Sequence, residues 1–113
     1  MRQGEVRWYT FGAPDKRRPV LILTRNSAIR FLNSLTVAPI TSIIRDIPSE
    51  VRLTPADGLL AECAANLDNI QTVPKANLGP PIAYLSPEKI EEVKRAICFA
   101  FGIDERLSDA PQL

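Results

Sequence analysis

Three consecutive cationic residues stand directly before a strongly apolar segment of the chain. Residues 16–18 are Lys-Arg-Arg, and Pro19 and the run VLIL at residues 20–23 follow them. A buried strand needs no cations at its edge for its stability, so the cluster requires a chemical explanation. A guanidinium is always charged and presents a planar fork of N–H donors that can hold two phosphoryl oxygens. The cationic cluster at residues 16–18 therefore predicts a contact with a polyanion.

The overall charge of the chain does not explain this cluster. Its 14 Lys and Arg residues and 13 Asp and Glu residues give a formal net charge of +1. A molecule so close to neutrality has no global field that draws it onto nucleic acid or an anionic membrane. Any polyanion must therefore be recognised by a local patch, and residues 16–18 are the candidate.

The composition excludes several kinds of catalytic site. The 113 residues contain no histidine, which excludes Ser-His-Asp and Cys-His nucleophiles and zinc sites that use imidazole. Two cysteines cannot close a structural zinc site alone, and the five glycines are scattered singly rather than grouped in a phosphate loop. We therefore expect no metal and no cofactor, and any catalysis must use Arg, Lys, Asp, Glu, Ser, Thr or Tyr.

The cysteines and the N-terminus indicate the compartment. Cys63 and Cys98 both lie in apolar surroundings, LLAECAANL and RAICFAFG, which predicts buried free thiols in a reducing environment. No apolar run approaches the ~20 residues of a membrane span. The N-terminus also lacks the apolar core of a signal peptide. We expect a cytoplasmic protein with no membrane partner.

The elements that position the cationic cluster are mostly strands. Alternating β-branched and aromatic residues predict a strand at 4–11, and Gly, Pro and Asp at 12–16 predict a turn. Further apolar segments predict three more strands, at 18–26, at 35–44 and within 46–58. The segment 63–73 is ambiguous, because its alanines favour a helix while NLDNIQTV alternates as a strand does.

The strongest helix signal lies near the C-terminus, at residues 86–102. Ser86 is a good N-cap, Pro87 suits the first helical position, and Gly102 ends the segment. Apolar residues at helical spacing form one stripe, and the charges Glu91, Glu92, Lys94 and Arg95 fit a solvated face. We expect one domain over residues 1–113, with a flexible tail at about 104–113. About five short strands and a terminal helix favour a mainly β fold with a helix, a twisted sheet or partial barrel that the helix closes.

Four pieces of the sequence, in order, resemble the MazF/PemK family, the toxins of type II toxin–antitoxin pairs. They are GEVRWYTF at 4–11, RPVLIL at 18–23, VAPIT at 37–41 and NLDNIQTV at 66–73. The resemblance implies a small SH3-like, partly open barrel of about five to seven strands with a C-terminal helix, and it resolves NLDNIQTV at 66–73 as a strand. It also implies a homodimer, a cognate MazE-like antitoxin, and a metal-independent endoribonuclease that cuts single-stranded RNA.

The resemblance also implies the site residues. Arg18 corresponds to the arginine before the family's PV strand and Thr41 to the threonine of ITS, and this pair is expected to be catalytic. The first loop, GAPDKR, is shorter than is common in the family and has Asp15 as its sole carboxylate. The remaining RNA contacts are expected from these residues: Lys16, Arg17, Ser42, Asn69 and Gln71. Of these, Asn69 and Gln71 are predicted to share a strand face, where their amides could read base edges.

Each assignment has a structural alternative. Arg18 could be a solvated charge at a strand edge, and Thr41 could be an ordinary β-branched strand residue. Asn69 and Gln71 could be ordinary exposed polar residues. Trp8 could stack on a base, although a lone tryptophan in a small barrel also fits the core. At the level of function, the alternatives are a non-catalytic binding module and a gyrase poison similar to the CcdB toxins.

Overall fold

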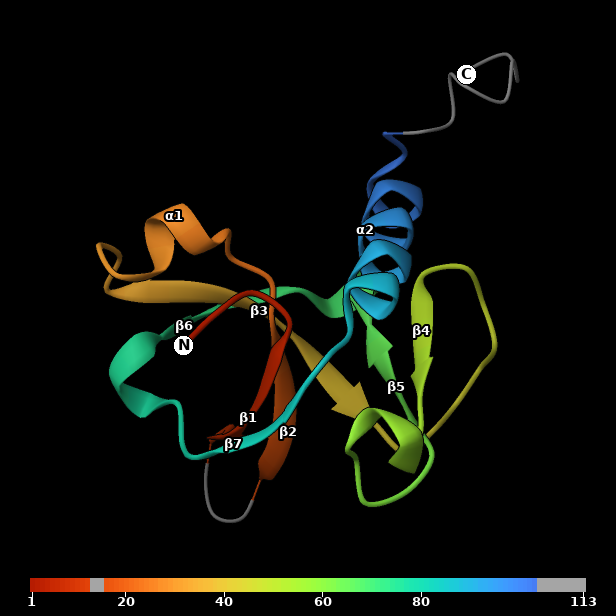
Figure 1. Cartoon of the computed structure of the whole chain (residues 1–113), viewed down its shortest axis with the longest axis horizontal. Coiled ribbons are helices and arrows are strands. Elements are labelled where there is room, and N and C mark those ends of the chain that lie inside the picture. The colour runs from red at the N-terminus through yellow and green to blue at the C-terminus, as the bar shows by residue number, and fades with distance from the viewer. Residues whose placement is uncertain (13–15, 104–113) are drawn as a thin grey trace.

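The strands predicted at 4–11 and 18–26 form an antiparallel pair, although the second strand ends at Ile22, earlier than predicted. The structure is a computed structural model that describes residues 1–12 and 16–103. The strands are β1 (Glu5–Thr10), β2 (Arg17–Ile22), β3 (Ser34–Thr41), β4 (Glu50–Leu53), β5 (Cys63–Asn66), β6 (Gln71–Pro74) and β7 (Pro81–Tyr84). They form one seven-stranded antiparallel sheet in which six strands follow the order β4-β5-β3-β2-β1-β7, and β6 pairs with β3 outside this order (Figure 1). The sheet curls into a half-barrel, so the predicted partly open, SH3-like barrel is confirmed.

Strand β3 holds the two halves of this sheet together. One edge of β3 pairs with β2, while the other pairs first with β6, at residues 34–37, and then with β5, at Ile40 and Thr41. The partner changes across Ala38 and Pro39. Thr41 is the last residue of β3, so the predicted strand at 35–44 is shorter than expected.

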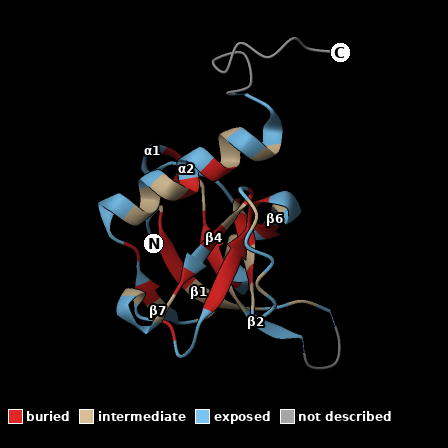
Figure 2. Ribbon diagram, turned by 90° about the vertical axis from the view of Figure 1, so that its right-hand side faces the viewer, coloured by how far each residue is buried: buried red, intermediate tan, exposed pale blue. Residues whose placement is uncertain are grey.

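The core lies on both faces of β2. Leu21 belongs to one buried cluster, which α2 (Pro87–Phe101) covers with Val93 and Ala96. Val20 and Ile22 belong to a second buried cluster under α1 (Asn26–Ile29). Figure 2 shows buried strand residues beneath the two helices. The apolar run at residues 20–23 is thus explained by burial on both faces, as a central strand requires.

Helix α2 is built as its sequence predicts. The Ser86 hydroxyl accepts a hydrogen bond from the Lys89 backbone N–H, and Gly102 ends the helix with a left-handed φ of 71°. Glu91 and Lys94 form an ion pair at 3.6 Å while both side chains stay exposed, which confirms this part of the solvated face. No helix within residues 1–12 and 16–103 has the length and apolar character needed to cross a bilayer.

The segment NLDNIQTV at 66–73 is not one strand, and that prediction is wrong. After β5, residues Leu67–Asn69 form a 3-10 helix, and β6 begins only at Gln71. The Asn66 side-chain oxygen caps this turn by accepting a hydrogen bond from the Asp68 N–H at 2.9 Å. Such a local side-chain bond competes with the strand ladder. Asn69 and Gln71 therefore do not share a strand face.

One strand was missed, and one expectation lies outside the described residues. Strand β7 was not expected from the proline-rich sequence around residue 80, and it lies at the end of the strand order, beside β1. The flexible tail expected at 104–113 falls outside the residues that the structure describes.

Candidate functional site

The register of β2 and β3 brings the two predicted catalytic residues together. Val20 pairs with Pro39 and Leu21 with Ala38, so the same register carried to the strand ends sets Arg18 opposite Thr41. Both residues line each of two cavities at this end of the sheet. The structure thus places Arg18 and Thr41 in one site, although they are far apart in the sequence.

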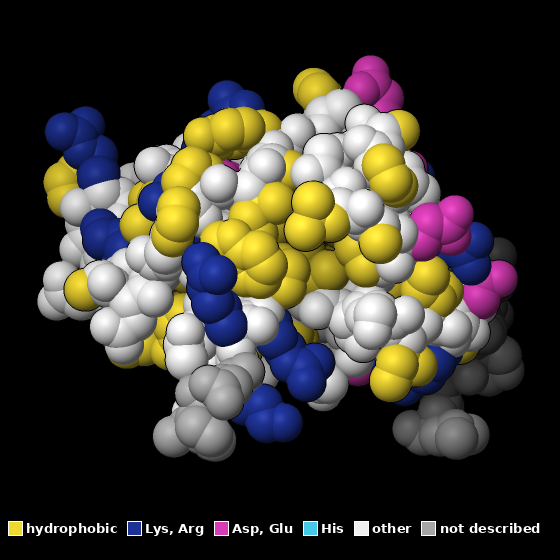
Figure 3. Space-filling view, turned by 90° about the horizontal axis from the view of Figure 1, so that it is seen from below, with side chains coloured by type: hydrophobic (Ala, Val, Ile, Leu, Met, Phe, Trp, Pro, Cys, Tyr) yellow, Lys and Arg dark blue, Asp and Glu magenta, His cyan; other side chains and the backbone are white. Residues whose placement is uncertain are grey.

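The first cavity beside this pair is mainly apolar. It has a volume of about 260 Å³, and its polar contributors besides the pair are Ser42 and Glu62. The apolar walls are formed by Trp8, Pro19, Ile40, Leu59, Leu60, Ala61, Cys63 and Ile82. Figure 3 looks onto this end of the molecule and shows Lys and Arg side chains next to an apolar surface. An apolar group joined to an anion fits these surroundings, with the anion next to Arg18.

The second cavity beside the pair is more polar. It has a volume of about 330 Å³ and shares Arg18 and Thr41 with the first. The other polar side chains that line it are those of Arg45, Glu50, Asn66 and Asn69. Arg18 and Thr41 therefore separate an apolar space from a polar, partly cationic one.

The Thr41 hydroxyl is oriented by the backbone that follows it. Its Oγ1 accepts a hydrogen bond from the Ile43 N–H at 3.0 Å. A hydroxyl has one proton to donate and two lone pairs to accept with. The Ile43 N–H uses only a lone pair of this oxygen. The bond therefore leaves the hydroxyl proton for an acceptor such as a phosphate oxygen.

Arg17 and Lys16 lie exposed at the start of β2. The Arg17 guanidinium lies 4.4 Å from the centroid of the Trp8 ring, a cation–π contact that holds it next to the first cavity. Trp8 itself is half-buried and lines that cavity, so it is a wall of the site rather than a fully enclosed core residue. Asp15, the carboxylate noted in the first loop, falls outside the described residues.

The other predicted contacts are divided among different surfaces. Ser42 lines the first cavity and Asn69 lines the second. Gln71 is exposed at the start of β6, where it pairs with Val37. It is not among the described residues that line either cavity. The structure therefore brings Ser42 and Asn69 to the Arg18–Thr41 pair but does not bring Gln71 there.

Sequence reasoning missed the ion pair between Arg45 and Glu50 in the second cavity. The Arg45 Nε donates to Glu50 Oε2 and its backbone N–H donates to Oε1, each at 2.9 Å. Burial raises the pKa of the Glu50 carboxyl. The two hydrogen bonds and the positive charge of Arg45, together with a hydrogen bond from the Asp46 backbone, outweigh burial, so the pKa is lowered overall. The opposite charges of Arg45 and Glu50, five residues apart, were the one signal in the sequence.

One further titratable group lines the first cavity. Burial raises the pKa of the Cys63 thiol, and the negative charge of Asp57 raises it further, so this wall of the first cavity stays protonated at neutral pH. Within the described part of the chain, no group of three or more His, Cys, Asp and Glu residues is arranged to hold a metal ion.

Comparison with known proteins gives consistent matches over most of the chain. Residues 2–101 match the family described as PemK-like, MazF-like toxin of type II toxin–antitoxin system. The chain is 41% identical over 90 residues to Endoribonuclease MazF3 of Mycobacterium tuberculosis, covering 80% of this chain and 87% of that protein. It is 38% identical over 102 residues to Probable endoribonuclease MazF5 of the same organism, covering 89% of each.

Solved structures give the same result. The Mycobacterium tuberculosis toxin MazF-mt6 superposes with a TM-score of 0.80 at 37% identity, covering 87% of this chain and 96% of that one. A mycobacterial endoribonuclease in complex with its cognate antitoxin also superposes with a TM-score of 0.80, at 27% identity, covering 91% and 96%.

Proposed function

The chain belongs to the PemK/MazF family of toxins of type II toxin–antitoxin systems, and from this premise we propose that Arg18 and Thr41 cleave single-stranded RNA. Curated relatives that share 34–41% of their residues with it are named endoribonucleases or probable endoribonucleases. The observation that carries the proposal is that Arg18 and Thr41 lie together at the junction of two cavities.

The chemistry available to this pair is transfer of a phosphoryl group within the RNA. The ribose 2′-oxygen loses its proton and bonds to the neighbouring phosphorus, while the bond from phosphorus to the 5′-oxygen breaks and that oxygen takes a proton. The products are a 2′,3′-cyclic phosphate and a 5′-hydroxyl. No metal is required in this route.

Each residue of the pair has a distinct role in this reaction. The phosphorane that forms on the way carries extra negative charge on its non-bridging oxygens, and the Arg18 fork can bind two of them. The Thr41 hydroxyl, whose oxygen already accepts from the Ile43 N–H, can donate its proton in a hydrogen bond to a phosphate oxygen. Losing one such preorganised donor costs roughly 10²–10³ in rate.

The proposal extends to the partners of this chain. RNA and a cognate, MazE-like antitoxin are its macromolecular partners, in the cytoplasm, and the active form is a homodimer. In support, a family relative has been solved in complex with its cognate antitoxin. The end of α2 also exposes apolar side chains, with Phe99 at 51% and Phe101 at 61%, on a helix that would otherwise face water. Cleavage of cellular RNA by this chain inhibits translation and growth.

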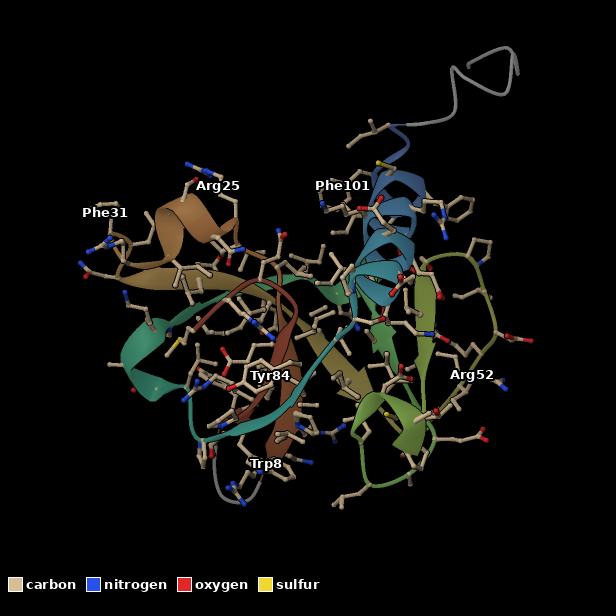
Figure 4. The ribbon with its side chains drawn as sticks, in the orientation of Figure 1. Trp8, Arg25, Phe31, Arg52, Tyr84 and Phe101 are labelled. Atoms are coloured by element: carbon tan, nitrogen blue, oxygen red, sulfur yellow. The ribbon has the colours of Figure 1, made fainter. Side chains whose placement is uncertain are left out.

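The test compares the wild type with Arg18→Ala and Thr41→Ala. Each substitution should abolish RNA cleavage in vitro and growth arrest in cells, while circular dichroism and thermal unfolding show a retained fold. Arg25→Ala is the matched control, because Arg25 is an exposed arginine at the opposite end of the molecule from Trp8 (Figure 4). Full cleavage by a folded Arg18 or Thr41 variant removes that residue from the mechanism.

The same assay separates the alternative functions. Tight RNA binding by the wild type without new RNA ends would indicate a binding module. Inhibition of gyrase supercoiling without RNA cleavage would indicate a poison similar to the CcdB toxins.

A further inference from the structure

We propose that the second cavity is a subsite for an RNA phosphodiester next to the one that is cleaved, with Arg45 as its cation and Glu50 as the residue that positions Arg45. The inference rests on the proposed function, because it takes RNA as the ligand. It adds a binding site to the Arg18–Thr41 pair and assigns roles to two residues outside the sequence motifs.

The first support is the way Glu50 holds Arg45. The Glu50 side chain is 2% exposed, whereas that of Arg45 is 51% exposed. The carboxylate accepts from both the backbone N–H and the Nε of Arg45. A guanidinium has five N–H donors, and only one of them is used in this side-chain bond. Glu50 therefore holds Arg45 through its Nε and its backbone, and Arg45 lines the second cavity with N–H donors that this pair does not use.

The second support is the backbone conformation next to Arg45. Asp46 has a φ of 60°, and it is the one non-glycine residue with positive φ among those the structure describes. Left-handed backbone is disfavoured for most residues with a side chain, and aspartate is one of the few that adopt it readily. Here the chain turns so that Arg45 and Glu50, at the two ends of the turn, can meet at the cavity wall.

The third support is the charge of the cavity. The Glu50 charge is balanced by Arg45, which leaves the charge of Arg18 in excess on the same wall. Asn66 pairs with Glu50 across β4 and β5, and its side-chain oxygen is already occupied by the Asp68 N–H. Its amide NH₂ group therefore adds a donor rather than an acceptor. An oxyanion is the group that fits two arginines and an amide donor.

A phosphodiester is the oxyanion that the location selects. The second cavity shares Arg18 and Thr41 with the cleavage site, so its ligand must be continuous with the strand that is cut. Each nucleotide of RNA carries one phosphate, and a strand that crosses the Arg18–Thr41 pair delivers its next phosphate to a neighbouring pocket.

The test measures binding and cleavage separately. The binding probe is a fluorescent pool of random-sequence 2′-fluoro RNA of about 12 nucleotides, within the length that single-strand sites cover. It lacks the 2′-hydroxyl nucleophile and cannot be cut by the proposed route. The dissociation constant is measured between about 50 and 200 mM KCl, because each lost phosphate contact lowers the slope of log K against log salt by about 0.7 for single strands.

Arg45→Gln should lower that slope by about 0.7 and weaken binding about tenfold at low salt. In cleavage of a long single-stranded RNA it should raise KM more than it lowers kcat. Arg45→Lys keeps the charge and should restore the slope. The control is Arg25→Gln, since Arg25 is an exposed arginine and is not among the described residues that line either cavity. It should leave slope, affinity and KM at wild-type values.

The Glu50→Gln variant distinguishes two effects of Glu50 on RNA binding, namely its positioning of Arg45 and its own negative charge. Removing a negative charge near RNA should by itself strengthen binding, whereas loss of the anchor for Arg45 should weaken it. The proposal predicts weaker binding and a raised KM in a variant whose thermal unfolding shows a retained fold. Should this variant not fold, the two Arg45 variants still decide the question.

An unchanged salt slope and affinity in Arg45→Gln would overturn the subsite and leave the proposed function intact. Failure of the wild type to cleave RNA would instead overturn the proposed function.

Discussion

The ion pair between Glu5 and Arg7 fixes the strand that carries Trp8, and breaking it should destabilise the fold strongly. The Glu5 side chain is 2% exposed, and its Oε2 lies 2.9 Å from the Arg7 Nη1. The Arg7 Nε also donates to the Gly79 carbonyl oxygen at 2.6 Å, which ties β1 to the segment before β7. Arg7→Met keeps much of the side-chain volume and removes both interactions.

The size of the effect follows from burial. Removing one partner of a buried ion pair costs about 3–5 kcal/mol of unfolding free energy when the remaining charge is uncompensated. Glu5 keeps a hydrogen bond from the Arg2 N–H at 3.0 Å and the N-terminal ammonium at 4.0 Å. The lower end of that range, about 3 kcal/mol, is therefore expected for Arg7→Met. For a domain of this size, about 4 °C of melting temperature corresponds to 1 kcal/mol, so the midpoint should fall by roughly 12 °C. Circular dichroism at one fixed protein concentration measures the change, since a dimer's stability depends on concentration.

Two variants make this prediction refutable. Glu5→Gln added to Arg7→Met removes the stranded charge and should recover at least about 1 kcal/mol. Arg52→Met removes a guanidinium whose nearest carboxylates, those of Asp46 and Glu62, are exposed and lie 3.8 and 3.9 Å away. It should cost less than about 1 kcal/mol. A loss below about 1 kcal/mol for Arg7→Met, or a double variant less stable than the single one, would refute the reasoning.

Three further predictions follow from charge and burial. Burial opposes ionisation of Glu50, but hydrogen bonds lower the pKa of its carboxyl in the folded protein. The ionised carboxylate therefore contributes fully to stability above the ordinary pKa of 4.5, and this contribution is lost as the pH falls through the lowered pKa of the folded state. Urea denaturation should show a lower free energy of unfolding at about pH 3 than at about pH 7. In Glu50→Gln, the share of this decrease that comes from Glu50 should be absent. Burial raises the pKa of Cys63, so a thiol reagent at neutral pH should modify the half-buried Cys98 first; equal rates in the native protein would contradict this. Lys16→Glu with Arg17→Glu should weaken both RNA and antitoxin binding, most clearly at low salt, and RNA bound at full affinity under saturating antitoxin would exclude a shared patch.

The parts of the fold that were predictable are those set by local chemistry. The run at residues 20–23 is apolar on both faces, which only a central strand satisfies, and β2 is such a strand. Helix α2 begins and ends where Ser86 and Gly102 predict, because both act on the neighbouring backbone. The pairing of β2 with β3 then brings Arg18 and Thr41 together.

The missed features depend on contacts that a periodic pattern does not express. The strand alternation of NLDNIQTV is real, yet the Asn66 side chain caps a 3-10 helix and breaks the strand before Gln71. Pro81 obscured β7, although proline is tolerated at the first residue of an edge strand. The Arg45–Glu50 pair needs the left-handed turn at Asp46 to close, and nothing in the order of residue types shows that turn.

The central claim is that Arg18 and Thr41 promote attack by the RNA's own 2′-hydroxyl. The most direct test incubates the protein with single-stranded RNA in excess EDTA and identifies both new ends by mass spectrometry. We expect cleavage at the same rate as without EDTA, with a 2′,3′-cyclic phosphate on one fragment and a 5′-hydroxyl on the other. The Arg18→Ala variant should not cleave the RNA. A 5′-phosphate product, or activity that EDTA abolishes, would show that water rather than the 2′-hydroxyl attacks or that a metal takes part, and would contradict the mechanism.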